Sequence, residues 1–245
     1  MAGHSQFANI KHRKGAQDAK KAKIFTKILR EITVSAKSGQ PDPNFNPRLR
    51  NAIIEARNHN LPKDRVEAAI KKVIAGNDND NFEEIRYEGY GINGVAVIVE
   101  ALTDNRNRTA SEVRSIFAKN GGVLGETGSV GFLFERIGII KFFRNNMSND
   151  IFFDIAIEAG ASDVYSDEEF HIAITDPDNF INSRDFLIEK LGDSVSAKLD
   201  WKAKNTVELS YEKAQTIIKM IDALEDCDDV QNVTANYVFT DNNGS

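Results

Sequence analysis

The sequence has 245 residues, of which 41% are hydrophobic and 28% are charged. At about 100 to 200 residues per domain, this length predicts two or three domains with ordinary cores. The longest apolar runs, at 95–99 and 137–140, are far shorter than the roughly 20 residues that span a bilayer, so we expect a soluble protein. No apolar stretch follows the charged N-terminus, which excludes a secretory signal, and a single cysteine excludes an intramolecular disulfide.

The charge is distributed very unevenly along the chain. Residues 1–75 contain 16 Lys and Arg against 6 Asp and Glu, whereas the remaining residues contain 15 basic against 31 acidic side chains. A basic head attracts a polyanion and an acidic body repels it, so binding should be oriented with the head first. The competing interpretation is a solvated basic helix with no ligand.

The N-terminal part predicts a basic arm followed by three helices. Residues 1–16 show no apolar period and are expected to be an arm that seeks polyanions. From 17 to 37, Ile24, Ile28 and Ile32 recur every four residues and predict a helix with one buried stripe. Further helices are expected from Pro47 and over 62–75, on either side of turn-rich sequence.

The second of these helices carries two cations where folding does not favour them. Asn46 and Pro47 are suited to its N-cap and first turn. Arg48 and Arg50 follow directly, and cations in the first turn oppose the helix dipole. A ligand could explain their presence.

The rest of the chain predicts a linker and then mixed α+β structure. The run at 77–81 is acidic, rich in Asn and without apolar residues, which is typical of a linker. Strands are expected at 85–90, 95–102, 130–134, 138–143, 169–174, 195–201 and 230–239, and helices at 111–119, 151–159, 182–191 and 211–224. The order suggests ferredoxin-like units in two small domains.

The search for catalytic or ligand chemistry gives little. Gly89, Gly91 and Gly94 match a nucleotide-binding pattern, but a β run follows them instead of a helix, so we expect a hairpin turn. The glycines of 121–128 have no following lysine, and a flexible connector is expected there. The four histidines lack the spacing of metal ligands, and no pair of carboxylates stands out. We therefore expect no catalytic residue, no metal, no cofactor and no enzymatic activity.

One polar loop in the acidic half stands out. Residues 103–109 carry Asn105, Arg106, Asn107 and Arg108. The structural interpretation is that Asp104 or Asn105 caps a turn while an arginine pairs with a carboxylate such as Glu112. The functional interpretation is a second, weaker nucleic-acid contact, because arginine planes and asparagine amides suit looped RNA.

Several short motifs resemble the YebC family. They recur in order along nearly the whole chain, at Met1–Ser5, Asn9–Lys14, Asp18–Lys21, Phe25–Lys27, Pro47–Arg50, Tyr87–Gly91, Thr103–Thr109 and Gly128–Val130. Members are generally labelled probable transcriptional regulators that bind DNA, and related proteins assist ribosomes on difficult stretches such as proline runs. The resemblance implies an α+β protein of three domains, with residues 1–76 as a helical head, 83–135 with 205–240 as a discontinuous domain, and 136–204 as an inserted acidic domain.

The combined interpretation is a non-enzymatic, nucleic-acid-binding regulator of gene expression. We expect binding through the basic residues of the head: Lys11, Arg13, Lys14, Lys20, Lys21, Lys23, Lys27, Arg48 and Arg50. Ribosomal RNA is the preferred partner, in a ribosome-associated translation factor, because no helix-turn-helix is evident and a basic arm can adapt to irregular RNA. The alternatives are a DNA-binding transcriptional regulator and an enzyme or interaction module built on the glycine loops. Membrane and small-molecule partners are not expected, and the start at the first motif favours a bacterial cytoplasmic form.

Overall fold

The computed structural model describes residues 17–76, 81–144 and 147–239, with side chains described from Lys21 onward. The described residues form two compact units. Of the described residues, the first unit contains 17–34, 75–76, 81–135 and 202–239, and the second contains 35–74, 136–144 and 147–201. The α+β class is confirmed, whereas the predicted boundaries of three domains stay a prediction. The predicted arm at 1–16 and residues 77–80 of the predicted linker lie outside the described residues.

The three N-terminal helices are confirmed. They are α2 (Gln17–Ser38), α3 (Pro47–Asn58) and α4 (Lys63–Ile74). Ile28 and Ile32 are buried in α2, as the four-residue spacing predicted, and Leu49 and Ala52 are buried in α3. Most of the stabilisation of such short helices comes from burying these apolar stripes.

Asn46 fixes the start of α3 with three hydrogen bonds. Its side-chain oxygen accepts from the backbone N–H of Leu49 at 3.0 Å, which is the expected N-cap bond. Its side-chain nitrogen donates to the carbonyls of Ser35 at 2.7 Å and Gln40 at 2.8 Å. The predicted cap therefore also holds the end of α2 and the loop that joins the two helices.

Replacing Asn46 with alanine should lower the free energy of unfolding by about 2 kcal/mol, since it removes a cap and leaves a buried carbonyl without its donor. Urea denaturation monitored by circular dichroism measures the change. Asn44→Ala is the matched control, because Asn44 is exposed in the same loop. Equal losses in the two variants would contradict this role of Asn46.

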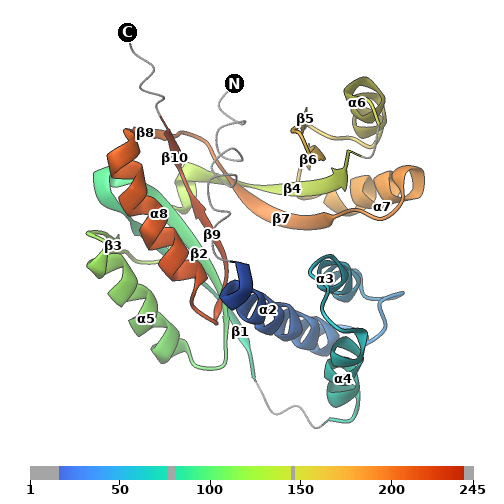
Figure 1. The fold of residues 1–245 in the computed structure, drawn as a ribbon, viewed down its shortest axis with the longest axis horizontal. Coiled ribbons are helices and arrows are strands. Elements are labelled where there is room, and N and C mark those ends of the chain that lie inside the picture. The colour runs from blue at the N-terminus through green and yellow to red at the C-terminus, as the bar shows by residue number, and fades with distance from the viewer. Residues whose placement is uncertain (1–16, 77–80, 145–146, 240–245) are drawn as a thin grey trace. The chain divides into compact units, whose positions relative to one another are not determined.

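The first unit is built on a four-stranded sheet. Its strand order is β3 (Val123–Leu124), β1 (Glu83–Tyr90), β2 (Ala96–Thr103) and β9 (Val230–Ala235), and the neighbours pair antiparallel. Helices α5 (Arg106–Lys119) and α8 (Tyr211–Glu225) pack on one face of this sheet (Figure 1). Val97, Val99, Phe117, Ile217 and Met220 lie in the core between them. A separate two-stranded sheet pairs β8 (Val207–Leu209) with β10 (Tyr237–Phe239) in parallel.

The glycine pattern at 89–94 forms the hairpin that the sequence predicted. Strands β1 and β2 are joined through a single turn of 3₁₀ helix, η1 (Ile92–Gly94). Asn93 and Gly94 have φ values of 57° and 74°, a conformation that Asn and Gly adopt most readily. The connector predicted at 121–128 is more ordered than expected, because β3 within it pairs with β1.

The second unit contains another four-stranded sheet. Its order is β5 (Asp163–Ser166), β6 (Phe170–Thr175), β4 (Phe134–Phe143) and β7 (Ser196–Ala203). Helices α6 (Asn149–Glu158) and α7 (Phe180–Leu191) contribute Phe152, Ala156 and Leu187 to a core with Phe142. Strand β7 lies at the edge of the sheet, where unpaired backbone groups are a liability. Two asparagines of α3, Asn51 and Asn58, donate to carbonyls of 195–197 beside this edge.

Three sequence predictions need correction. The helix predicted at 111–119 begins earlier, at Arg106, because Asn105 caps it inside the segment that was expected to be a loop. The segment predicted as a strand at 130–134 is mainly a 3₁₀ turn, η2 (Gly131–Leu133), followed by β4. The short strands β5 and β8 were missed, because strands of three or four residues show too little alternation to be recognised.

Candidate nucleic-acid interface

The candidate residues of the predicted arm and of α2 differ in what the structure describes of them. Lys11, Arg13 and Lys14 lie outside the described residues, and Lys20 is placed only by its backbone in α2. The side chain of Lys21 is exposed, with its ammonium 5.8 Å from the centre of the Phe25 ring. Lys21 is therefore available to a ligand in this structure.

Lys23 and Lys27 instead bond within the first unit, at the C-terminal end of α8. The Lys27 ammonium donates to the carbonyl of Glu225 at 2.6 Å, and the Lys23 ammonium donates to the carbonyl of Asp226 at 2.9 Å. One helical turn further along α2, Arg30 donates to the carbonyls of Leu102 and Asp228 at 2.8 Å and 2.9 Å. Three cations of α2 thus satisfy backbone carbonyls at and just beyond the end of another helix.

These contacts have a simple electrostatic cause. The last carbonyls of a helix have no partner inside it and form the negative end of its dipole, so nearby cations stabilise it. Glu225 and Asp226 add negative charge at the same place. Burial lowers the pKa of Lys27, while the nearby carboxylates, Glu225 first, favour its charged form. The two lysines therefore have a structural use that the charge count alone did not indicate.

Replacing both Lys23 and Lys27 with glutamine should lower the free energy of unfolding by about 1 to 2 kcal/mol, because two charged donors to helix-end carbonyls are lost. Thermal unfolding measures this effect. Lys21→Gln serves as the control, since it removes an exposed ammonium from the same helix and should cost under about 0.5 kcal/mol. A double variant as stable as the control would show that the α8 contacts contribute little.

A buried carboxylate, Asp229, lies at the centre of the neighbouring hydrogen-bond network. One of its oxygens accepts from Arg30 at 2.7 Å. The other accepts from Thr109 at 2.6 Å, Arg108 at 2.8 Å and Thr103 at 3.1 Å. The network joins α2 to the β2–α5 turn and to the segment that leads into β9.

The surroundings of Asp229 keep it ionised. Burial alone would raise its pKa, but the hydrogen bonds from Thr109, Arg108, Arg30 and Thr103 outweigh burial and hold the pKa at about 2. The same carboxylate raises the pKa of Arg108. Burial and a hydrogen bond to Glu112 raise the pKa of the nearby Cys227 to about 12, so this thiol is not poised as a nucleophile.

The predicted second patch, on the β2–α5 turn, consists of Asn105, Arg106, Asn107 and Arg108. The side chains of two of these residues, Asn105 and Arg108, bond within the unit. Asn105 caps α5 by accepting from the N–H of Arg108 at 3.0 Å, which confirms the structural interpretation of a capped turn. The expected pairing of an arginine with a carboxylate is also present, because Arg108 pairs with Asp104 at 2.7 Å and with Asp229 at 2.8 Å. Arg106 and Asn107 are exposed on the first turn of α5 and remain candidates for ligand contact.

In the second unit, the two predicted arginines of α3 differ in their surroundings. The Arg50 guanidinium donates to the carbonyls of Pro43 at 2.9 Å and Asn44 at 3.0 Å, so it fixes the α2–α3 loop. This explains a cation in the first turn of α3 without a ligand. Arg48 is half-buried.

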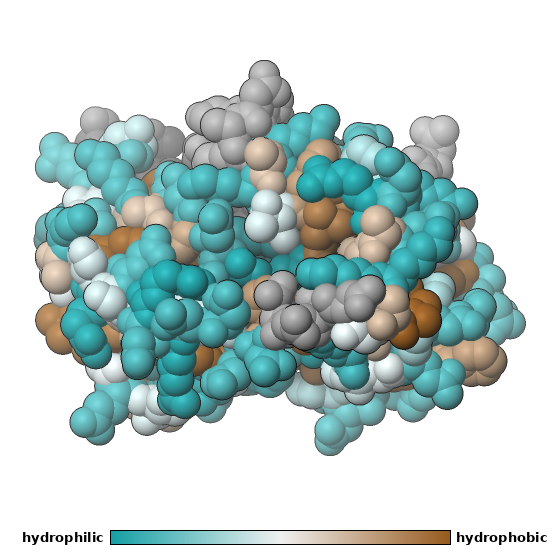
Figure 2. All heavy atoms as spheres, turned by 90° about the horizontal axis from the view of Figure 1, so that it is seen from below, coloured by the Kyte–Doolittle hydropathy of each residue, from teal (hydrophilic) through white to brown (hydrophobic). Residues whose placement is uncertain are grey.

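The sequence analysis missed a set of exposed cations on α3 and α4. These residues are Arg57, Lys63, Arg65, Lys71 and Lys72. Lys63 and Lys71 approach Glu67 at 3.6 Å and 3.9 Å, and the five cations outnumber the three carboxylates of these helices, Glu55, Asp64 and Glu67. Hydrophilic residues also dominate the face shown in Figure 2, where apolar side chains form separate patches. The four basic against two acidic residues of α4 were the signal in the sequence that could have identified these cations.

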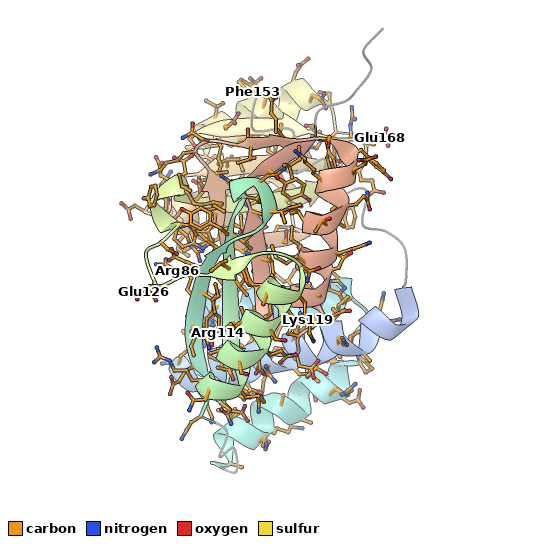
Figure 3. The ribbon with its side chains drawn as sticks, turned by 90° about the vertical axis from the view of Figure 1, so that its left-hand side faces the viewer. Arg86, Arg114, Lys119, Glu126, Phe153 and Glu168 are labelled. Carbon is orange, nitrogen blue, oxygen red and sulfur yellow. The ribbon has the colours of Figure 1, made fainter. Side chains whose placement is uncertain are left out.

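Two of the sequence motifs meet at Glu88 in the first unit. This buried carboxylate accepts from the N–H groups of Val130 at 2.9 Å and Gly131 at 2.7 Å. Arg86, labelled in Figure 3, lies 2.9 Å from its other oxygen. Burial alone would raise the pKa of Glu88, but the backbone hydrogen bonds and Arg86 outweigh burial and bring the pKa below its ordinary value. The group is therefore held as an anion. The motif at 128–130 is thus a loop that the carboxylate of the motif at 87–91 holds in place.

The described ranges contain no group of three His, Cys, Asp or Glu residues that could hold a metal ion. Within the same ranges, no helix combines the length and the apolar content needed to cross a membrane. In each unit taken by itself, most of the cations with described partners bond to carboxylates or backbone carbonyls, and only the exposed cations are open to a ligand.

Comparison with known proteins identifies the family. Residues 82–237 match a family model described as the TACO1/YebC second and third domain, and residues 5–76 match the model of the TACO1/YebC N-terminal domain. The chain belongs to the TACO1/YebC family. The larger model has the label Transcrip_reg, which marks a regulator of gene expression rather than an enzyme and supports nucleic acid as the partner of this TACO1/YebC chain.

The fold is also similar to that of a solved structure. A crystal structure of a conserved hypothetical protein from Aquifex aeolicus matches with a TM-score of 0.85 and 46% sequence identity. The match covers 96% of this chain and 97% of the other. That protein is described without an activity, so the similarity supports the fold of this TACO1/YebC chain and says nothing of its function.

Proposed function

We propose that this protein is a non-enzymatic regulator of gene expression that binds ribosomal RNA and acts as a translation factor in the cytoplasm. The observation that carries the proposal is the concentration of basic charge at one end of the chain. Residues 1–75 hold 16 Lys and Arg against 6 Asp and Glu, and the rest of the chain is acidic. Phosphate contacts supply most of the affinity of such proteins, so the basic end should be the part that binds.

The structure refines which cations are available for this role. Lys21 in the first unit is exposed, and so are Arg57 and Arg65 in the second. Lys23, Lys27 and Arg50 donate to backbone carbonyls, so a nucleic acid would have to displace internal bonds to engage them. We therefore place the main contacts on the arm at 1–16 and on the exposed cations.

RNA is preferred over DNA because of the chemistry of the β2–α5 turn. Arg106 and Asn107 are exposed beside each other on the first turn of α5. Arginine planes stack on unpaired bases and amides bond to base edges, which are accessible in looped RNA. The proposal includes a role in helping ribosomes translate difficult stretches, such as proline runs, which follows from the family resemblance.

A second candidate function is that of a DNA-binding transcriptional regulator. The family label favours it. Helices α3 and α4 are joined by only four residues, His59–Pro62, a length found in helix-turn-helix motifs. Lys63, Arg65 and Lys72 on α4 would then face a DNA groove or its phosphates.

Binding measured over a range of salt concentrations tests the proposal. If about six phosphates are neutralised, log affinity should fall with log salt with a slope near −5 on a duplex and near −4 on single-stranded RNA. An affinity that does not change with salt would refute nucleic-acid binding.

Competition at fixed salt separates the two functions. A DNA regulator should prefer its own site over random duplex by roughly 10³-fold or more, whereas a ribosomal factor should show little preference among duplexes and should bind ribosomal RNA more tightly. Sedimentation of cell extract in low and high salt adds an independent measure, because a translation factor should move with ribosomes at low salt and leave them at high salt.

A further inference from the structure

Helix α6 in the second unit exposes large apolar side chains on the side that faces away from its core. Phe152 and Ala156 on the inner side are fully buried. Ile151, Phe153 and Ile157 on the outer side are 55%, 51% and 47% exposed. Phe153 is labelled on this helix in Figure 3. Phe153 and Ile157 are one turn apart and form a second apolar face on this ten-residue helix, which needs only one such face to fold.

The same outer side carries three carboxylates. Asp150, Asp154 and Glu158 follow one another at four-residue spacing, and all three are exposed. Within the described part of the chain, none of them forms an ion pair with a cation. Like charges at this spacing repel, and the last two approach the negative end of the helix dipole. Asp150 suits the first turn of the helix, where the dipole favours a negative charge, but the folding of this unit explains neither Asp154 and Glu158 nor the exposed apolar residues.

We propose that this outer face of α6 is a docking surface for a basic amphipathic helix of another protein. Apolar residues of the partner would cover Phe153 and Ile157, and its lysines or arginines would pair with the row of carboxylates. Charge complementarity excludes nucleic acid as the occupant, because phosphates would be repelled by the same carboxylates. The inference is separate from RNA binding, which the basic end of the chain would perform.

A labelled peptide tests this surface on the full-length protein. The probe is a fluorescein-labelled peptide of about 18 residues, long enough to be helical, with leucine along one face and lysine along the other. Fluorescence anisotropy should show binding with a dissociation constant of about 10 to 100 µM, as expected for a small interface. A peptide of the same pattern with glutamate in place of lysine should not bind.

Two variants and a matched control locate the binding. The neutralised variant Asp150→Asn/Asp154→Asn/Glu158→Gln and the polar variant Phe153→Ser/Ile157→Ser should each weaken binding of the lysine peptide by about tenfold or more. Neutralisation should not unfold the helix, because it removes repulsion. The control Asp178→Asn/Glu189→Gln/Asp193→Asn removes three exposed carboxylates elsewhere in the same unit and should leave binding unchanged.

The alternatives give distinct results. Absence of binding up to about 1 mM peptide, or equal losses in the neutralised variant and its control, would overturn the proposal. Tighter peptide binding after Lys11, Arg13 and Lys14 are replaced with glutamine would assign the face to the protein's own arm, which also overturns it. RNA affinity measured on the same variants should stay unchanged, so failure here and failure of the proposed function are distinguishable.

Discussion

Replacing Asp229 with alanine is expected to lower the free energy of unfolding by about 3 kcal/mol or more. The change leaves Arg30, largely buried with a side chain 13% exposed, without its carboxylate. It also removes the acceptor of the buried Thr103 hydroxyl and one of the acceptors of the buried Thr109 hydroxyl. Urea denaturation followed by circular dichroism gives the loss directly. Asp229→Asn, which keeps one acceptor oxygen but not the charge, should fall between the wild type and Asp229→Ala.

The neighbouring residue provides the control for this prediction. Asp228→Ala removes a carboxylate from an exposed side chain, while the backbone carbonyl of residue 228 still accepts from Arg30. Its effect should be under about 0.5 kcal/mol. Losses of similar size at 228 and 229 would mean that general negative charge, and not the specific network, stabilises this region.

The pH dependence provides a second measurement on the same residue. Because the pKa of Asp229 is lowered from 3.8 to about 2 in the folded protein, the unfolded state binds more protons between these values. The resulting stabilisation, about 2 kcal/mol, is complete above pH 4 to 5 and is lost as the pH falls toward 2. The difference in stability between wild type and Asp229→Asn should therefore shrink over this range of pH.

Local patterns in the sequence were sufficient to predict most of the helices and strands. The four-residue spacing of Ile28 and Ile32 and the capping signal at Asn46 act between neighbours in the chain, and the structure places both as expected. The hairpin at 91–95 was also predictable, because glycines followed by a β run indicate a turn between strands. Errors fell where elements are short or where a cap lies inside a polar segment, as at Asn105.

The partners of the candidate site residues could not be predicted in the same way. Lys27 bonds to Glu225 and Arg30 bonds to Asp229, both about 200 residues later in the sequence, so no local period relates the two. The spacing of a lysine relative to an apolar stripe is the same in the sequence whether that lysine contacts phosphate or the end of another helix. The count of basic residues therefore indicated the kind of ligand but overestimated the number of available contacts.

The arm and the start of α2 should account for much of the RNA affinity. Replacing Lys11, Arg13, Lys14 and Lys21 with glutamine is expected to weaken binding to ribosomal RNA by about 100-fold at moderate salt. Each lost phosphate contact also removes counterion release, so the salt slope on a duplex should become shallower by about 3.6. Anisotropy titrations over a series of salt concentrations measure both quantities.

A variant with the same change in charge separates specific contacts from general attraction. Arg114, Lys119, Lys213 and Lys219 are exposed on α5 and α8 in the acidic part of the chain, and Arg114 and Lys119 are labelled in Figure 3. Replacing these four with glutamine changes the net charge equally but should leave the salt slope almost unaltered, because salt screens charges that lie beyond about 10 Å of the phosphates. If both sets shifted the slope alike, RNA would be attracted by the charge of the whole molecule, and the basic end would have no special role. If only the replacement of Lys11, Arg13, Lys14 and Lys21 changed the salt slope, the phosphate contacts would lie at the start of the chain, because only those cations would be close to the phosphates.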